Sequence, residues 1–175
     1  LGARCPAMDL NAACSGFIYA LDVADGYFAR GRVKKVLVIA AEAMSRLVDW
    51  HDRSTCVLFG DGAGAVVLGE GGDLLSLRLS AQGDLSGALA IPAPRGNFPR
   101  GGHPSLEREG YLQMNGQEVF RFAVTSMCRD VRAVVEEAGL TGEQIDYLLP
   151  HQANIRIIEA AKNRLSIPAD RYRTN

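Results

Sequence analysis

In residues 7–31 the pattern of apolar residues changes from one typical of a strand to one typical of a helix, and this change most limits how the chain can fold. Ala7 to Leu10 is a short apolar run, which favours a strand. Apolar side chains then recur at the spacing of one helix face up to Gly31, namely Phe17, Leu21, Ala24 and Phe28. Val36 to Ala41 is a continuous apolar run, typical of a parallel strand buried on both faces. The pattern predicts a strand–helix–strand unit and an α/β fold.

Cys14 lies between the first predicted strand and the helix, in the stretch Asp-Leu-Asn-Ala-Ala-Cys-Ser-Gly-Phe from Asp9 to Phe17. A thiol at a helix start is close to unpaired backbone N–H groups and to the positive end of the helix dipole, and both favour the thiolate. Because the thiolate is the nucleophilic form, Cys14 is a candidate nucleophile. Cysteine is also often buried for packing alone. The local sequence leaves both interpretations open.

The second half of the chain repeats this arrangement. Asp146 to Leu149 is predicted to be a buried strand that ends at Pro150, and His151 follows directly. An apolar helix face comes next, formed by Ile155, Ile158, Ala161 and Leu165, with Asn154 near the helix start. Ligands of open α/β sheets bind beyond the carboxyl ends of strands, so Cys14 and His151 are expected to face each other. A neutral imidazole donates a hydrogen bond there, which makes His151 the second candidate catalytic residue.

The remaining elements are predicted from the same periodicities. Strands are expected at Val57 to Leu68, Leu75 to Leu79 and Tyr111 to Met114, and a helix from Phe120 to Ala138 that ends at Gly139. Cys128 lies beside the apolar stripe of that helix, as a core residue. Thr141 and Gln144 have the spacing of a capping box. Gln82 to Gly110 is rich in glycine and proline and predicts a surface loop.

Composition argues against several classes of function, although a local basic patch is still compatible with it. A net charge of −1 gives no support for binding to nucleic acid or to a membrane surface. The longest apolar run, Val36 to Ala41, is far too short to span a bilayer, and the first residues lack a signal-peptide pattern. The 4 cysteines are widely spaced without a Cys-x-x-Cys pair, which disfavours a zinc site and a disulfide framework. We expect a cytoplasmic protein with reduced thiols and no metal.

Four segments resemble one enzyme family. They are Ala-Ala-Cys-Ser-Gly-Phe, Phe-Gly-Asp-Gly-Ala-Gly-Ala, Asn-Gly-Gln-Glu-Val-Phe-Arg and Pro-His-Gln-Ala-Asn-Ile-Arg-Ile, and they occur in the order found in β-ketoacyl-[acyl-carrier-protein] synthase III. The resemblance implies a thiolase-like α/β fold, a layered αβαβα architecture of two related halves that is incomplete in this chain. Residues 1–72 would be the latter part of the N-terminal half and residues 73–175 the first part of the C-terminal half. It also implies a homodimer.

The resemblance implies a decarboxylative Claisen condensation that starts fatty-acid synthesis. Cys14 would take the acyl group from a short acyl-CoA primer and hold it as a thioester. Malonyl-acyl-carrier protein would then lose carbon dioxide and attack that thioester. His151 would stabilise the negative charge that develops on the malonyl thioester oxygen. No cofactor is implied, because acyl-CoA and malonyl-acyl-carrier protein are both substrates.

The resemblance also implies binding residues. Arg53 matches the arginine that contacts the CoA nucleotide, and Gly116, Phe120 and Asn154 match positions along the pantetheine tunnel. Gln117 departs from the asparagine of some members and is left out of the binding set. Arg121 and Arg156 match basic positions for docking of the acidic carrier protein, with Lys162 and Arg164 on the same terminal helix in support. A solvated surface charge is the alternative interpretation of each cation.

One part of the family's machinery has no counterpart in these residues. The third catalytic residue is an asparagine in a Gly-Asn-Thr-Ser segment, and neither Asn154 nor Asn175 matches it by motif. The chain is therefore expected to be a central piece of a longer synthase, unstable and inactive alone. Two other functions stay open: a related polyketide-priming or starter-acyl transferase, and a non-catalytic subunit that binds the carrier. The sequence does not define the primer length.

Overall fold

The computed structural model describes residues 2, 4–91 and 110–174, and these residues form two compact units. Unit 1 comprises Leu1–Ala41 and Ala63–Leu79, and unit 2 comprises Glu42–Gly62 and Ser80–Asn175. The predicted boundary between residues 72 and 73 concerns the halves of a longer fold and stays a prediction. No helix within the described ranges is long and apolar enough to cross a bilayer.

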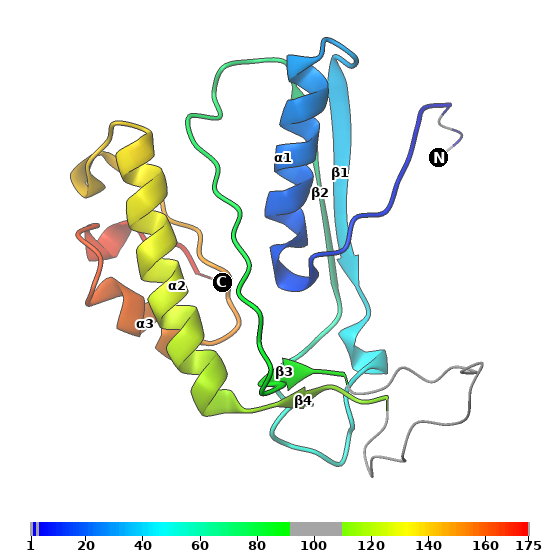
Figure 1. The fold of residues 1–175 in the computed structure, drawn as a ribbon, viewed down its shortest axis with the longest axis vertical. Helices are drawn as coiled ribbons and strands as arrows, with labels where there is room; N and C mark the ends of the chain where they lie inside the picture. Colours follow the sequence, from blue (N-terminus) through cyan, green and yellow to red (C-terminus); the bar gives the residue numbers. More distant parts are fainter. Residues whose placement is uncertain (1, 3, 92–109, 175) are drawn as a thin grey trace. The chain divides into compact units, whose positions relative to one another are not determined.

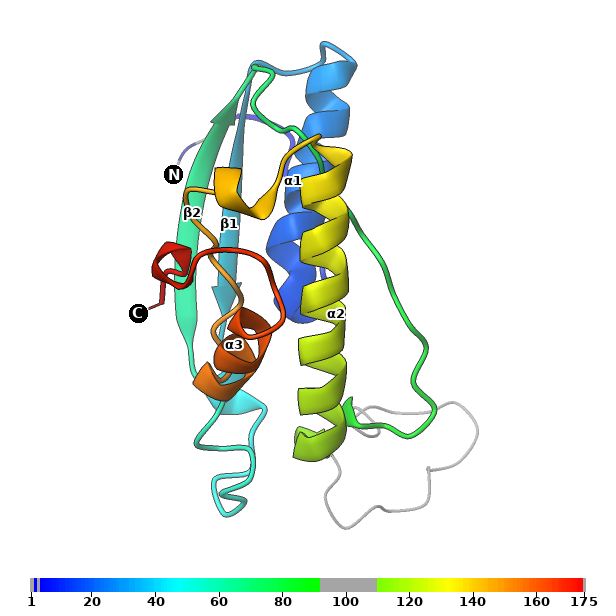
Figure 2. The same ribbon diagram turned by 90° about the vertical axis from the view of Figure 1, so that its left-hand side faces the viewer.

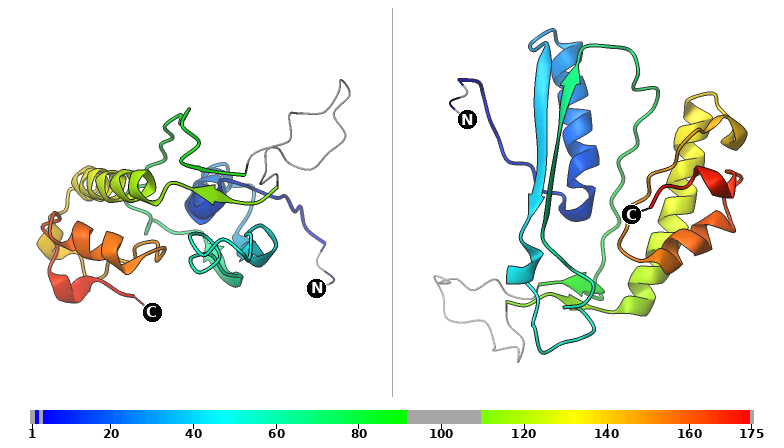
Figure 3. Two further views of the ribbon diagram at one scale, coloured as in Figure 1. Left: turned by 90° about the horizontal axis from the view of Figure 1, so that it is seen from below. Right: turned by 180° about the vertical axis from the view of Figure 1, so that it is seen from behind.

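Unit 1 is built from one helix and two strands (Figure 1). A short 3₁₀ turn, η1 (Ala13–Ser15), leads into α1 (Gly16–Ala29), and β1 (Lys35–Glu42) follows. β1 pairs with β2 (Gly62–Gly69) in a two-stranded sheet, and the two arrows run in opposite directions in Figure 3. The predicted helix and the predicted strand at Val36 to Ala41 are therefore confirmed.

The expectation that this strand is parallel and buried on both faces is wrong for the described residues. Val38 is buried with 7% exposure, whereas its neighbours Leu37 and Ile39 are 51% and 59% exposed. Successive side chains of a strand point to opposite faces of the sheet, and one face of this two-stranded sheet is therefore exposed.

Three other predicted strands differ from the structure. Ala7 to Leu10 and Leu75 to Leu79 have no assigned strand. The strand expected from Val57 begins only at Gly62, because the preceding residues form turns, with the Leu58 N–H donating to the Thr55 carbonyl at 2.9 Å. A strand exists only where a partner pairs with its backbone, and apolar alternation alone does not supply that partner.

Unit 2 contains a loop and a short antiparallel pair of strands. After η2 (Met44–Arg46), β3 (Leu89–Ala90) pairs antiparallel with β4 (Gln113–Met114). The predicted strand at Tyr111 to Met114 is confirmed in its last two residues. Most of the predicted loop at 82–110, namely residues 92–109, lies outside the described residues.

The helices of unit 2 enclose its core. α2 (Gly116–Glu137) contacts α3 (Ile155–Lys162), and Figure 2 shows the two helices side by side. Val124, Cys128, Ile157, Ala161 and Leu165 form one buried cluster, and Ile158, Ile167 and Tyr172 form another. Cys128 is 5% exposed, which confirms its prediction as a core residue. The buried stripe of α2 is the one that the periodicity predicts. In the predicted face at the end of the chain, Ile158, Ala161 and Leu165 are buried, but Ile155, the first residue of α3, is 57% exposed, so its assignment to that face is wrong.

Capping side chains fix the helix ends of unit 2. Asn115 accepts the Glu118 N–H at the start of α2, and Gly139 follows its end with a φ of +69°. The Gln144 side chain accepts the Thr141 N–H at 2.9 Å, which confirms the capping box before η3 (Gly142–Gln144). The last short turn is η4 (Ala169–Arg171).

The predicted strand at Asp146 to Leu149 is reduced to one bridge. Leu148 pairs in parallel with Tyr172, and Leu148 exchanges backbone hydrogen bonds of 3.0 Å with Arg171 and Arg173. This bridge fixes the chain immediately before Pro150 and His151.

Candidate active site

Cys14 lies in the η1 turn, two residues before α1 begins. Ala13, immediately before it, has a φ of +47°, the only positive φ at a non-glycine residue among the described positions. The Asn11 side chain accepts the Ala13 N–H at 3.0 Å, and the Ala12 carbonyl accepts the Ser15 N–H at 3.0 Å. A left-handed alanine is strained, and such strain persists where the surrounding backbone imposes it. The turn therefore holds Cys14 in one backbone position.

The thiol of Cys14 is exposed, unlike that of Cys128. The interpretation of Cys14 as a buried packing residue is therefore wrong for this structure. The first N–H groups of a helix have no partner within the helix, and no side chain of the N-cap residue Ser15 accepts one of them in α1. This environment is the one that the sequence predicted for a reactive thiol.

His151 is exposed and follows the Leu148–Tyr172 bridge. Three residues later, Asn154 caps α3 by accepting the Arg156 N–H at 2.9 Å. The short segment that contains His151 is thus anchored on both sides, by the bridge and by the helix cap. Cys14 belongs to unit 1 and His151 to unit 2, so their expected proximity stays a prediction.

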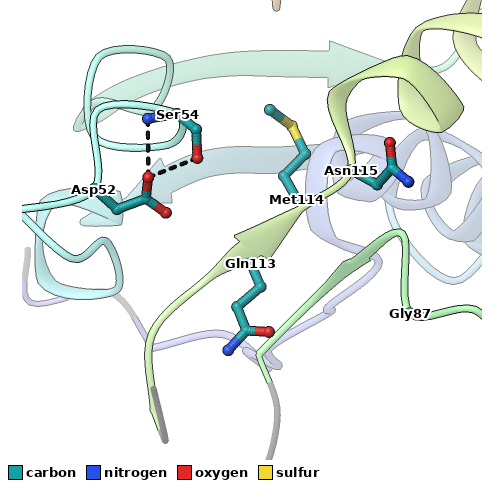
Figure 4. Close-up of a pocket in the computed structure, with 6 residues that line it drawn as sticks. All are labelled: Asp52, Ser54, Gly87, Gln113, Met114 and Asn115. Carbon is teal, nitrogen blue, oxygen red and sulfur yellow. Dashed lines mark hydrogen bonds between the residues drawn. The ribbon is translucent and has the colours of Figure 1, made fainter. Parts of the chain in front are cut away.

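Arg53 is exposed on a loop of unit 2 that borders a polar hollow of about 250 Å³ (Figure 4). The lining residues are Asp52, Ser54, Gly87, Gln113, Met114 and Asn115. Asp52 and Ser54 flank Arg53 in sequence, and Asn115 directly precedes Gly116. Two predicted binding positions, Arg53 and Gly116, are thereby brought to the same part of unit 2. The hollow itself was not predicted from the sequence. Of its lining residues, Asn115 alone has a local sequence signal, as the N-cap of α2.

Phe120 and Asn154, the other predicted tunnel positions, lie on the two helices that contact each other. Phe120 is half-buried and packs against the cluster formed by Val124 and its neighbours. Asn154 is half-buried at the start of α3, where its side chain serves as the N-cap. Both positions therefore have a structural role in unit 2, and their place along a substrate tunnel stays a prediction.

The four predicted docking cations differ in their surroundings. Arg121, Arg156 and Arg164 are exposed. Lys162 is half-buried, and its ammonium lies 2.8 Å from a Glu159 carboxylate oxygen and 5.4 Å from the centre of the Tyr172 ring. Its charge is therefore already balanced within unit 2, and the three arginines present the more accessible charge.

Two exposed aspartates of unit 2 have lowered pKa values. The Ser45 hydroxyl and backbone N–H donate to Asp61, and these bonds lower the pKa of its carboxyl. Asp84 accepts from the Ser86 hydroxyl, the Ala88 N–H and the Ser86 N–H, which lowers its pKa in the same way. Across the described part of the chain, no three His, Cys, Asp or Glu side chains are grouped so that they could hold a metal ion.

Comparison with known proteins gives consistent matches. The profile of 3-oxoacyl-[acyl-carrier-protein (ACP)] synthase III matches residues 8–83, and the profile of its C-terminal part matches residues 135–175. β-Ketoacyl-[acyl-carrier-protein] synthase III of Rhizorhabdus wittichii is 49% identical over 171 residues, covering 95% of this chain and 51% of that relative. The chain spans about half the length of the curated relatives it matches.

Solved structures agree with these matches. 3-Oxoacyl-[acyl-carrier-protein] synthase III from Aquifex aeolicus superposes with a TM-score of 0.81 at 46% identity, covering 95% of this chain and 50% of that one. The priming β-ketosynthase from the R1128 polyketide biosynthetic pathway superposes with a TM-score of 0.73 at 34% identity, covering 94% and 49%.

The chain therefore has the thiolase-like α/β fold, over about half the length of these structures. Together the two profiles match more than half of its residues, and it belongs to the 3-oxoacyl-[acyl-carrier-protein] synthase III family. The resemblance inferred from four short segments is confirmed.

Proposed function

We propose that this chain is part of a condensing acyltransferase of fatty-acid initiation, which joins an acyl-CoA primer to malonyl-acyl-carrier protein. The observation that carries the proposal is the exposed Cys14 in a strained turn at a helix start, in a chain of the synthase III family. Helix-start N–H groups favour the thiolate that the first step needs.

The first step is acyl transfer to Cys14. Its thiolate attacks the carbonyl carbon of the acyl-CoA thioester, a new C–S bond forms, and the bond to the CoA sulfur breaks. CoA leaves as its thiol after taking up a proton, and the acyl group stays on Cys14 as a thioester. The Cys14 backbone N–H is suited to stabilise the carbonyl oxygen while it carries negative charge.

The second step forms the carbon–carbon bond. The malonyl group loses carbon dioxide, and the electron pair of the broken C–C bond becomes an enolate. His151 donates a hydrogen bond to the thioester oxygen on which that charge develops. The enolate carbon attacks acyl-Cys14, the C–S bond breaks, and β-ketoacyl-carrier protein leaves with Cys14 again a thiolate.

Substrate binding is assigned to unit 2. Arg53 contacts the CoA nucleotide, and the hollow beside it lies next to Gly116 at the start of α2. Phe120 and Asn154 extend this binding surface along α2 and α3. Arg121 and Arg156 attract the acidic carrier protein, with Lys162 and Arg164 in supporting positions. We also propose a cytoplasmic homodimer without metal or cofactor.

Mass spectrometry of the complete protein with acyl-CoA tests the proposal. The expected result is an acyl adduct on Cys14, followed by loss of that adduct and release of β-ketoacyl product when malonyl-carrier protein is added. Labelling of Cys56 or Cys128 instead would contradict the nucleophile assignment. Absence of any adduct would favour the non-catalytic carrier-binding subunit. Turnover by the 175-residue chain alone would contradict the expectation that it is inactive.

A starter-acyl transferase of polyketide synthesis is the second candidate. The observation in its favour is the 34% identity to a structure described as a priming β-ketosynthase of a polyketide pathway. Competition between carrier proteins separates the two: preference for a polyketide carrier over a fatty-acid carrier by kcat/KM would favour the second candidate.

A further inference from the structure

The loop that carries Arg53 is closed at its base by one pair of side chains. Ser45 donates its backbone N–H to Asp61 Oδ1 at 2.7 Å and its hydroxyl to Asp61 Oδ2 at 2.6 Å. Both carboxylate oxygens are therefore used, and the two ends of residues 45–61, here called the Arg53 loop, are held together. Hydrogen bonds to an ionised acceptor are among the stronger ones in proteins. We call this pair the Ser45–Asp61 clasp.

Between its ends the Arg53 loop is a series of tight turns. The Asp49 side chain accepts the His51 N–H at 2.9 Å, and the Asp52 side chain accepts the Ser54 N–H at 3.0 Å. The Asp52 carbonyl accepts the N–H groups of Thr55 and Cys56 at 3.2 and 3.0 Å. Arg53 therefore lies in the middle of a hydrogen-bonded turn and not in a loop without internal hydrogen bonds.

Buried side chains anchor this turn on either side of Arg53. Val48 is 1% exposed and Thr55 is fully buried. The Leu47 carbonyl accepts the Leu112 N–H at 2.8 Å, which joins the Arg53 loop to the residues before β4. The placement of Arg53 therefore depends on both ends of the loop, which the clasp joins.

We propose that Ser45 and Asp61 are positioning residues for the acyl-CoA step, acting through Arg53. This inference rests on the proposed function, since it takes Arg53 as a contact of the CoA nucleotide. Without the clasp, the Arg53 loop samples more conformations. Acyl-CoA binding must then order the loop, and this entropic cost weakens binding. The pair is therefore expected to govern acyl-CoA binding and to leave both chemical steps unchanged.

The test is steady-state kinetics of the complete protein with acyl-CoA and malonyl-carrier protein varied separately. Ser45→Ala and Asp61→Asn are each expected to raise KM for acyl-CoA about fivefold, the size of roughly one ordinary intramolecular hydrogen bond. The kcat and the KM for malonyl-carrier protein should not change. Ser45→Thr keeps the hydroxyl and should restore the KM.

Ser86→Ala is the matched control. Ser86 donates its N–H and hydroxyl to Asp84 at 2.8 and 2.7 Å, and its hydroxyl also lies 3.0 Å from a Glu118 carboxylate oxygen. Ser86→Ala therefore loses hydroxyl–carboxylate bonds of the same kind outside the Arg53 loop. Its KM for acyl-CoA should match that of the unsubstituted protein. An equal rise in Ser86→Ala, or a rise in both KM values for Ser45→Ala and Asp61→Asn, would overturn the inference, because either result indicates a general loss of folding.

The Arg53→Ala variant distinguishes a failure of the clasp inference from a failure of the proposed function on which it rests. If Arg53→Ala leaves KM for acyl-CoA unchanged, the assignment of Arg53 to the CoA nucleotide fails. If Arg53→Ala raises KM but Ser45→Ala and Asp61→Asn do not, the clasp is overturned while the proposed function stands. Residues that act through one group are non-additive, so Ser45→Ala combined with Arg53→Ala should raise KM no further than Arg53→Ala alone.

Discussion

Cys14 in unit 1 and His151 in unit 2 both precede a helix, but the structure holds them in different ways. Cys14 follows a strained alanine and stands in a 3₁₀ turn directly before α1. His151 is in an unstrained segment between a single bridge and an Asn-capped helix, and that helix is part of a packed core. The comparison teaches that local backbone geometry positions the proposed nucleophile, whereas packing around α3 positions the proposed hydrogen-bond donor.

Replacing the proposed nucleophile is the strongest test of this comparison. Cys14→Ala in the complete protein should abolish acylation and reduce condensation by at least about 10³-fold, because no other group accepts the primer. Intact-protein mass spectrometry with acyl-CoA measures the first effect and product formation the second. Cys128→Ala is the control, since that thiol is buried in the core. Continued acylation of the Cys14→Ala protein would disprove the assignment.

Replacing the proposed donor should separate the two steps. His151→Ala should reduce condensation by about 10²- to 10³-fold, the usual effect of removing one oxyanion donor, while acyl transfer to Cys14 continues. Single-turnover experiments with preloaded acyl enzyme measure the second step alone. An equal loss in acylation and condensation would show that His151 serves the thiol rather than the malonyl oxygen.

Removing core volume sharpens the difference in packing. Ile158 is 1% exposed in unit 2, so Ile158→Ala should lower the free energy of unfolding by about 2–5 kcal/mol. Ile18→Ala on α1, where the side chain is 42% exposed, should have a much smaller effect. Urea denaturation followed by circular dichroism compares them. Equal losses would contradict the contrast between the two helices.

Changing Ala13 tests the strain itself. A β-branched residue tolerates a positive φ poorly, so Ala13→Val should destabilise by about 1–2 kcal/mol. Ala13→Gly removes the strain from the folded state but raises the conformational entropy of the unfolded state. These two effects on the free energy of unfolding should cancel to within about 1 kcal/mol. Thermal unfolding of both variants measures this. Identical stability for Val and Gly at this position would show that the left-handed conformation is not maintained.

The smallest expected effect is one of pH on unit 2. The Asp84 pKa is lowered by bonds from Ser86 and Ala88, so the carboxylate stabilises the fold at pH values above its ordinary value of 3.8. That contribution is lost as the pH falls through the lowered value. The stability difference between Asp84→Asn and the unsubstituted chain should therefore shrink below about pH 4. A difference that stays constant from pH 6 to pH 2.5 would contradict it.

Helices were predictable from sequence because their signals are local. The apolar stripe of α2, its end at Gly139 and the Asn154 cap all appear within a few residues of the elements they define. Strands were less predictable, since Ala7 to Leu10 is an apolar run but has no strand partner in the described residues. A strand depends on a partner that the local pattern does not name.

The candidate site divides in the same way. Cys14 and His151 were recognisable from their position before helices and from motifs around them. The hollow beside Arg53 was not, because its lining comes from residues 52, 54, 87 and 113–115, which are far apart in the sequence. The Ser45–Asp61 pair was also missed: its members are sixteen positions apart, and no periodicity connects them.

The Arg53 loop also contains the chain's single tryptophan. Trp50 is 65% exposed, and its indole N–H donates to the Ser45 carbonyl at 3.2 Å. Indole fluorescence responds to hydrogen bonding and to water, so emission from this one side chain reports the state of the loop without an attached dye. Within these 175 residues, opening of the loop base is therefore expected to change the emission of a single side chain, and binding of the proposed CoA nucleotide beside Arg53 is expected to change it as well.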